Sequence, residues 1–430
     1  MISKWDWLWK QFSRTLWVRA LLYSLLAIVI ALVAIWVDPY IPEDFGGRIG
    51  ADAVDQILDI MASSMLAVTT FSLTVMVSAY SAATSSVTPR ATRLLMQDTT
   101  TQNVLSTFLG AFLFSLVGIV GLNAGAYGDG GRVLLFVVSL AMILIVALTL
   151  LRWISHLTHF GRVGNTTQRV EDAARNALEY WVEHPCLGAN PLTDLSLIPG
   201  SAQTLLAWKV AYVEHVDTKK LSECACEWGV KVYVLAAPGA FVNPTVPLAK
   251  IEGSLNDEQR RALQDAFFLA GERSFDQDPR YGMCVLAEIA SRALSPAVND
   301  PGTAIDVLSR SVRILSYWTS YKQENSNKES SGNGKGPAPK CENVWIAPLD
   351  PHDVFNDFFT PIARDGASLI EVQVRLQKVL RNLADLQPHT LKDAARHHAS
   401  LALARAQQSL SLEEDRKSLT DLSHRLFEQN

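Results

Sequence analysis

The stretch IMASSMLAVTTFSLTVMVSAYSAATSSVT, residues 60–88, carries no charge and is long enough to cross a membrane as one helix. At about 100° per residue, its small and hydroxylated side chains fall within roughly an 80° sector of that helix. We call six of them the hydroxyl stripe: Ser63, Thr70, Thr74, Ser78, Ser81 and Ser85. The opposite face carries Met65, Met76, Tyr80 and Val87. The stretch therefore predicts a membrane helix with one hydroxylated face.

Two interpretations of the stripe stay open. Membrane helices pack through small residues, and Ser or Thr can bond across helices, so the stripe fits a packing seam. It also fits the lining of a weakly selective cation path, because Asp59 shares its helical angle and a charge near the membrane is costly when it has no role. The candidate pore-lining residues are therefore Asp59 and the hydroxyl stripe. At the other end, Pro89 is expected to break the helix just before Arg90.

Four membrane spans are predicted, at about residues 21–37, 60–86, 104–124 and 133–151, which makes residues 1–159 a four-helix membrane domain. Basic residues precede the first span, separate the second from the third, and follow the fourth. They are Lys4, Lys10, Arg14, Arg19, Arg90, Arg93, Arg152 and Arg162. By the positive-inside rule, both termini of this multi-pass protein face the cytoplasm.

The rest of the chain predicts a mixed α+β cytoplasmic domain over residues 160–321, a flexible linker over 322–340 and a helical C-terminal region over 341–430. Strands are expected at 211–217 and 230–235. Helices are expected at 219–228, 257–271, 281–293 and from residue 303 onward, and later at 351–359 and 369–427.

A small β element is expected at PGAFVNPTVPLAKI, residues 238–251. This segment resembles the half-motif of lipoyl- and biotinyl-type hybrid barrels, in which a glycine before Phe-Val starts one strand and Pro-Leu starts the next. A carrier domain of that type needs a lysine at the tip of an exposed hairpin, in a Met-Lys or Asp-Lys context. No such lysine is found here, so the resemblance implies a β hairpin or barrel scaffold without a swinging arm.

The segment ALSPAVNDPGTA, residues 293–304, predicts a rigid turn between two helices. Asp300 is the candidate N-cap and Pro301 takes the first helical position. Alternatively, Ser295, Asn299 and Asp300, with the neighbouring Pro296, form a binding site for an ion or a partner segment.

Four motifs in order, TPRATRLL (88–95), the 238–251 segment, GERSFDQDPRYG (271–282) and ALSPAVNDPGTA, resemble a bacterial family of predicted membrane proteins of unknown function, domain of unknown function 2254. The chain departs from that family where Ser86-Val87-Thr88 precedes Pro89-Arg90, since the family usually reads Gln-Phe-Ser there, and where Gly302 replaces a bulky residue. The resemblance implies architecture and location, and no activity.

Other function classes are not favoured. The net charge of −5, without a basic stripe with aromatics, argues against nucleic-acid binding. No zinc-protease, nucleophile-elbow, dinucleotide-type glycine or Walker motif appears, and nothing brings the carboxylates of Asp276, Asp278 and Asp300 together, so no enzyme activity is expected. His156 and His159 lack a third nearby ligand, so we expect no metal and no cofactor.

The favoured function is a homo-oligomeric ion-conducting or permeation protein in the lipid bilayer, with the second span lining the path. The alternative is a membrane-anchored sensor or scaffold whose cytoplasmic domain binds a protein partner.

Overall fold

The computed structural model describes residues 15–37, 51–158, 160–329, 341–386 and 389–427. The chain divides into two compact units, residues 8–166 (the membrane unit) and residues 167–430 (the α/β unit). The boundary falls inside α8 (Val163–Glu183). Lys4, Lys10, Arg14, His159 and most of the expected linker lie outside the described residues.

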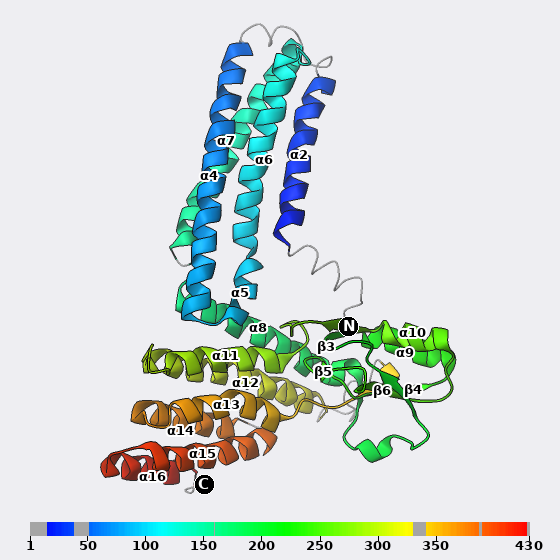
Figure 1. Cartoon of the computed structure of the whole chain (residues 1–430), viewed down its shortest axis with the longest axis vertical. Helices are drawn as coiled ribbons and strands as arrows, with labels where there is room; N and C mark the ends of the chain where they lie inside the picture. Colours follow the sequence, from blue (N-terminus) through cyan, green and yellow to red (C-terminus); the bar gives the residue numbers. More distant parts are fainter. Residues whose placement is uncertain (1–14, 38–50, 159, 330–340, 387–388, 428–430) are drawn as a thin grey trace. The chain divides into compact units, whose positions relative to one another are not determined.

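Four helices of the membrane unit are long and apolar enough to cross a membrane. They are α2 (Leu16–Val37), α4 (Ala51–Ser86), α6 (Thr99–Asn123) and α7 (Asp129–Leu157), and they pack along one another (Figure 1). All four expected spans are confirmed as helices. Each helix begins several residues earlier than its apolar stretch, because helical hydrogen bonding continues through polar residues such as Asp55 and Thr101.

Small residues of α2 face the core of the membrane unit. Ala27, Ala31 and Ala34 are buried, whereas Leu21 and Leu25 on the same helix are exposed. This arrangement is typical of membrane helices, in which small residues allow close packing and large apolar ones face lipid.

The α/β unit contains a five-stranded sheet with strand order β1-β8-β4-β6-β2. β8 runs parallel to both β1 and β4, whereas β6 runs antiparallel to β4 and β2. A second sheet of three antiparallel strands has the order β5-β3-β7. The strands are β1 (Ala189–Pro191), β2 (Gln203–Leu206), β3 (Ala211–Val216), β4 (Lys231–Val234), β5 (Phe241–Val242), β6 (Pro247–Glu252), β7 (Phe267–Ala270) and β8 (Cys341–Ile346).

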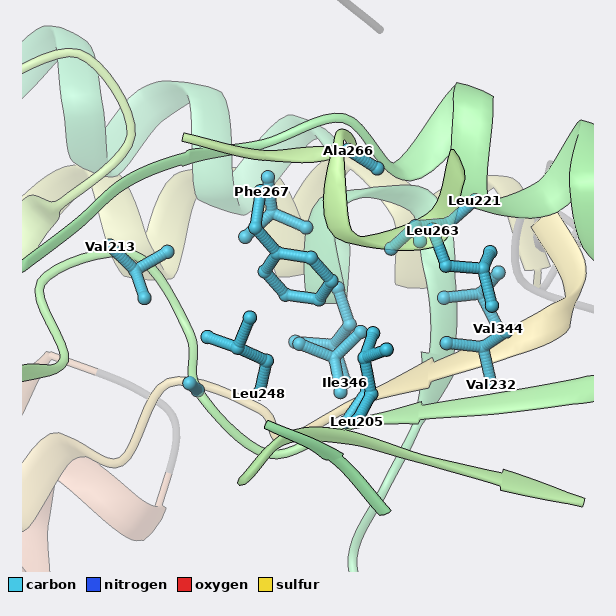
Figure 2. Packing of buried hydrophobic residues seen from close by; sticks show 14 of the residues in the cluster. Leu205, Val213, Leu221, Val232, Leu248, Leu263, Ala266, Phe267, Val344 and Ile346 are labelled. Atoms are coloured by element: carbon cyan, nitrogen blue, oxygen red, sulfur yellow. The ribbon is translucent and has the colours of Figure 1, made fainter. Parts of the chain in front are cut away.

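The core of the two sheets is closed by α9 (Thr218–Trp228) and α10 (Asp257–Gln264). Figure 2 shows Leu248 and Ile346 of the larger sheet pointing toward Phe267 of the smaller one, with Leu221 and Leu263 from the two helices beside them. Each of these side chains is buried, and burying one contributes about 1.5–3 kcal/mol.

Two local expectations need correction here. The strands of the 238–251 segment form where expected, but β5 pairs with β3 and β6 pairs with β2 and β4, so they join different sheets and do not pair as a hairpin. The expected helix at 257–271 ends at Gln264, and residues 267–270 form β7. Pairing with β3 outweighs the helical pattern there because it buries Phe267 and Leu269.

The expected linker of residues 322–340 is bordered by a helix and a strand. α12 continues to Glu329, eight residues into that stretch (322–329), and β8 begins directly after it. β8 was not predicted. It inserts between β1 and β4, so the C-terminal region shares a sheet with residues 189–252.

Helices pack on one another through the rest of the α/β unit (Figure 1). The expected helices at 281–293, after 303 and at 351–359 are confirmed, and the stretch 369–427 divides into three helices. The helical segments are η2 (Pro185–Gly188), η3 (Leu195–Leu197), α11 (Pro279–Ala293), α12 (Pro301–Glu329), α13 (Pro351–Asp365), α14 (Ile370–Asp385), α15 (His389–Ser409) and α16 (Glu413–Phe427).

α8 and α11 approach one another closely at a glycine. A Cβ on Gly282 would lie 2.4 Å from the Cβ of Ala174 and 2.7 Å from its Cα. Backbone and Cβ atoms cannot rotate away as a flexible side-chain end can, so the two helices need glycine at this point.

We expect Gly282→Ala to lower the free energy of unfolding by about 1–3 kcal/mol, because the added methyl group pushes α11 away from α8. Chemical unfolding of the full-length protein in detergent measures this change. Gly271→Ala is the control, since a Cβ at Gly271 meets nothing within 4 Å. Equal stability of the two variants would contradict the close approach.

Candidate functional site

The hydroxyl stripe lies on the face of α4 that the membrane unit leaves open. All six stripe residues are exposed. Met61 and Met65, on the opposite side, are buried against Phe108 and Trp153, and Met76 is buried against Leu105. The packed face of α4 is therefore the methionine face, and the stripe is turned away from the rest of its own unit.

Hydroxyl groups of the stripe bond to the helix that carries them. Ser63 Oγ donates to the carbonyl of Asp59 at 2.9 Å, and Thr70 Oγ1 to that of Leu66 at 3.0 Å. Thr74 and Ser78 each donate to the carbonyl four residues earlier, at 3.0 and 2.9 Å, and Ser85 to Ala82 at 2.9 Å. The protons of these five hydroxyls are satisfied internally, so their outward lone pairs remain available as acceptors.

Two carboxylates lie near the start of α4. Asp59 is exposed and falls inside the apolar segment of residues 53–85, rather than just before it as expected. Asp55 lies one turn earlier, and its Oδ1 is buried without a hydrogen-bond partner in the part of the chain that the structure describes. At 1.5 Å per residue this segment is about 50 Å long, longer than a hydrocarbon core of about 30 Å, so Asp59 can still lie at an interface.

The other end of α4 breaks at the predicted proline. α4 ends at Ser86, and the short helix α5 (Pro89–Met96) begins with Pro89 in its first turn. Thr88 is buried and caps α5 by accepting from the backbone N–H of Arg90 at 3.4 Å. Thr88, Pro89 and Arg90 therefore form a capped bend between α4 and α5. Pro89 and Arg90 are both exposed at this bend.

An acid–base pair that the sequence did not predict follows this bend. Asp98 is buried and caps α6 by accepting from the backbone N–H of Thr101 at 3.0 Å. Its Oδ2 also lies 2.8 Å from Nε2 of His156 near the end of α7, whose ring stacks on Trp153. His156, which we had considered only as half of a weak metal pair with His159, instead connects α7 to the start of α6. Asp98 before three threonines was a recognisable cap signal.

The ALSPAVNDPGTA segment folds as the predicted capped turn. The backbone N–H of Asn299 donates to the carbonyl of Ser295 at 2.9 Å, and Asp300 accepts from the backbone N–H of Thr303 at 3.1 Å. The Thr303 hydroxyl and the Thr303 backbone N–H both donate to the Asp300 carboxylate, and these two hydrogen bonds lower the pKa of Asp300 below its ordinary value. Pro301 is the first residue of α12, and Asn299 has a left-handed backbone with φ of 50°. Pro296, Asn299 and Asp300 are exposed, so the turn places these motif residues together at the surface.

The GERSFDQDPRYG motif is mainly structural. Asp278 is buried, caps α11 by accepting from the backbone N–H of Tyr281 at 3.1 Å, and accepts from Arg273 Nε at 2.7 Å. Gly239 of the PGAF segment packs against the same carboxylate: φ is +92°, and a Cβ there would lie 2.2 Å from Asp278 Oδ2. Asp278 and Asp300 are thus caps of two different helices.

The described residues contain no group of three or more His, Cys, Asp or Glu side chains placed to hold a metal ion.

A buried glutamate connects α8 to α12. Glu171 is 1% exposed and accepts from Arg310 Nη1 and Arg313 Nε, each at 2.6 Å. Gln168 also accepts from Arg310, at 2.7 Å. Burial by itself would raise the pKa of Glu171, but the hydrogen bonds and charges of the two arginines outweigh it and lower the pKa below its ordinary value.

Known proteins place the chain among membrane proteins. The sequence pattern of a family described as "Predicted membrane protein (DUF2254)" matches residues 13–382. The uncharacterized proteins Mb1321c of Mycobacterium bovis and Rv1290c of Mycobacterium tuberculosis are each 28% identical over 252 residues. That alignment covers 55% of this chain and 47% of each relative, so the chain spans about half the length of the curated relatives it matches. No solved structure matches.

We expect the free energy of unfolding to fall as the pH drops below about 4.5, because the unfolded chain then binds a proton that folded Glu171 does not bind. Glu171→Gln should remove this part of the pH dependence, and should cost about 3 kcal/mol at neutral pH because two arginines lose their carboxylate. Unfolding curves of the full-length protein between pH 3.5 and 7 (roughly the range that spans carboxylate titration) measure both effects. Glu227→Gln, an exposed glutamate of α9, is the control and should change neither.

Proposed function

The chain belongs to the family of predicted membrane proteins described as DUF2254, and on that premise we propose that it forms a homo-oligomer whose α4 helices line an ion-conducting or otherwise permeable path. The observation that carries this proposal is the position of the hydroxyl stripe. It is exposed along α4, on the side away from the buried methionines. If several copies are arranged around a common axis with this face of α4 inward, their hydroxyl stripes meet at the axis.

The chemistry of the stripe suits a hydrated path. Since Thr70, Thr74 and Ser78 donate to carbonyls of their own helix, their oxygens present acceptor lone pairs to water or to a cation. Asp59 would favour cations at one end, whereas Arg90 at the other end would oppose them. The proposal therefore includes a permeation path without a fixed ion preference.

We also propose the orientation that the basic residues indicate: a bacterial inner membrane, with both termini and the α/β unit on the cytoplasmic side. The proposal includes no catalytic step, because Asp278 and Asp300 serve as helix caps.

We expect Thr74→Leu to abolish ion flux into liposomes that contain the full-length protein, because the larger apolar side chain fills and dries the path. Thr84→Leu is the matched control. Thr84 is also exposed, and its hydroxyl also donates to its own helix, to the Tyr80 carbonyl at 2.8 Å, but it lies about 80° from Thr74 around the helix. Flux should persist in the control variant.

Two results would reject the path. One is the absence of flux from folded, oligomeric wild-type protein. The other comes from single cysteines introduced at Thr70 and Met76 and treated with a water-soluble thiol reagent. The path requires reaction at position 70 and protection at position 76, where Met76 is buried, so equal protection at both positions contradicts it.

A second function is favoured by the exposed turn between α11 and α12. Val298 is 48% exposed and lies beside Pro296 and Asn299 in a segment held by its own hydrogen bonds. A rigid, apolar and exposed tip of this kind suits recognition by another protein. The protein would then be a membrane-anchored sensor or scaffold, with the hydroxyl stripe as a packing seam between copies.

We expect Val298→Asp in the full-length protein to reduce capture of a specific partner at least tenfold, measured by quantitative affinity purification from the native membrane. Leu412→Asp, which changes a side chain that is 53% exposed elsewhere in the α/β unit, is the control and should leave capture unchanged. Equal capture by both variants, or no enrichment by the wild type, would rule out this turn as the recognition site.

A further inference from the structure

An apolar edge lies where the two sheets of the α/β unit meet, and neither proposed function uses it. Four of its side chains are largely exposed: Leu206 at 41%, Trp208 at 46%, Val210 at 64% and Phe241 at 57%. Isolated exposed apolar residues are ordinary, but several of them on neighbouring chain segments are typical of an interaction surface.

The backbone brings these four residues together. Residues 207–211 connect β2 to β3 and run beside the β5–β6 segment, with Ala207 N–H donating to the Val246 carbonyl at 3.2 Å and Ala211 opposite Val242. Phe241 lies opposite Tyr212, their ring centroids 5.1 Å apart. The apolar edge (Leu206, Trp208, Val210 and Phe241) is therefore one surface built from two chain segments.

The reason for the exposure lies in the neighbouring residues. Leu205, Ala207, Ala211 and Val242 are all buried in the core. A strand that covers a core with one face usually presents polar residues on the other. Here Leu206, Trp208 and Val210 are exposed although they are apolar or aromatic, and Thr204 and Lys209 are the exposed polar residues among them.

The charge around the edge favours one occupant. Residues 203–213 and 236–249 contain a single charged side chain, Lys209, which is exposed between Trp208 and Val210. Arg260 of α10 lies behind the same strand and donates to the carbonyl of Thr204 at 3.0 Å. Within these two segments, exposed tryptophan and phenylalanine with lysine, and without acidic residues, match the interfacial layer of an anionic membrane.

The chain itself holds this unit beside a membrane. The last apolar helix ends at Leu157 and the α/β unit begins at Thr167, and the link of residues 158–166 spans at most about 30 Å even when fully extended. A tethered surface reaches a high effective concentration at its target, so even a small patch can bind. We propose that the apolar edge docks on the lipid surface, with Trp208, Val210 and Phe241 in the interfacial layer and Lys209 among anionic headgroups.

A nitroxide attached at Val210→Cys in the full-length protein tests the docking, in liposomes of phosphatidylcholine and phosphatidylglycerol. The background carries Cys226→Ser, since Cys226 is the exposed cysteine of the described residues. Burial raises the pKa of Cys186 and of Cys284 to about 11, which keeps these two thiols protonated and slow to label. Collision with oxygen, which concentrates in lipid, is compared with collision with a water-soluble nickel chelate.

The oxygen-to-nickel accessibility ratio at position 210 should exceed severalfold the ratio of a label at Leu412→Cys. Equal ratios would show that the edge faces water and would overturn the proposal. Shielding of the label from both reagents would also overturn the proposal, because it would show that the edge is covered by protein. Dipolar broadening between labels would then identify that protein as a second copy of this chain. If Val210→Cys does not fold, a label at Trp208→Cys gives the same test. None of these outcomes depends on ion flux through α4.

Discussion

Polar groups in a hydrocarbon environment have to be satisfied by the protein, and this constraint accounts for several contacts of the membrane unit. Asp55 Oδ1 and Ser72 Oγ are exceptions, because both are buried without a hydrogen-bond partner among the described residues. Along α4, five of the six stripe hydroxyls donate to carbonyls of the same helix, as in Thr74 to Thr70. The Tyr127 hydroxyl donates to the Ala31 carbonyl of α2 at 3.0 Å. Asp98 at the start of α6 takes His156 of α7 as its partner. The protons of these five hydroxyls need no neighbouring helix, so this face of α4 can border lipid, another copy or water.

The same constraint operates in the core of the α/β unit. Glu171 is buried with two arginines of α12, and Asp278 with Arg273. Gln277 accepts from the indole N–H of Trp181 through its carbonyl, at 2.7 Å, and from the backbone N–H of Val216 through its side chain, at 2.9 Å. Glu171 thus ties α8 to α12, and Gln277 ties α8 to β3.

The recognisable motifs of the family separate into structural and exposed ones. The motif at 271–282 and the glycine of PGAF meet at Asp278 and hold the core together. The bend at Pro89 and the turn at residues 295–300 have satisfied backbones but carry their distinctive side chains at the surface. In this chain, changes in the buried motifs are therefore expected to alter folding, whereas changes in the exposed ones leave the core intact.

Local patterns in the sequence determined the four apolar helices, the hydroxylated face of α4, the break at Pro89 and the capped turn at Asp300, because apolar length, helical period, proline and cap chemistry act over a few residues. Only the tertiary structure decided that the methionine face of α4 is the packed one, that β5 and β6 enter different sheets and that β8 completes the larger sheet. It also decided that His156 meets Asp98 and Glu171 meets Arg310. These outcomes depend on contacts between residues far apart in the chain, where burial and pairing outweigh local preference.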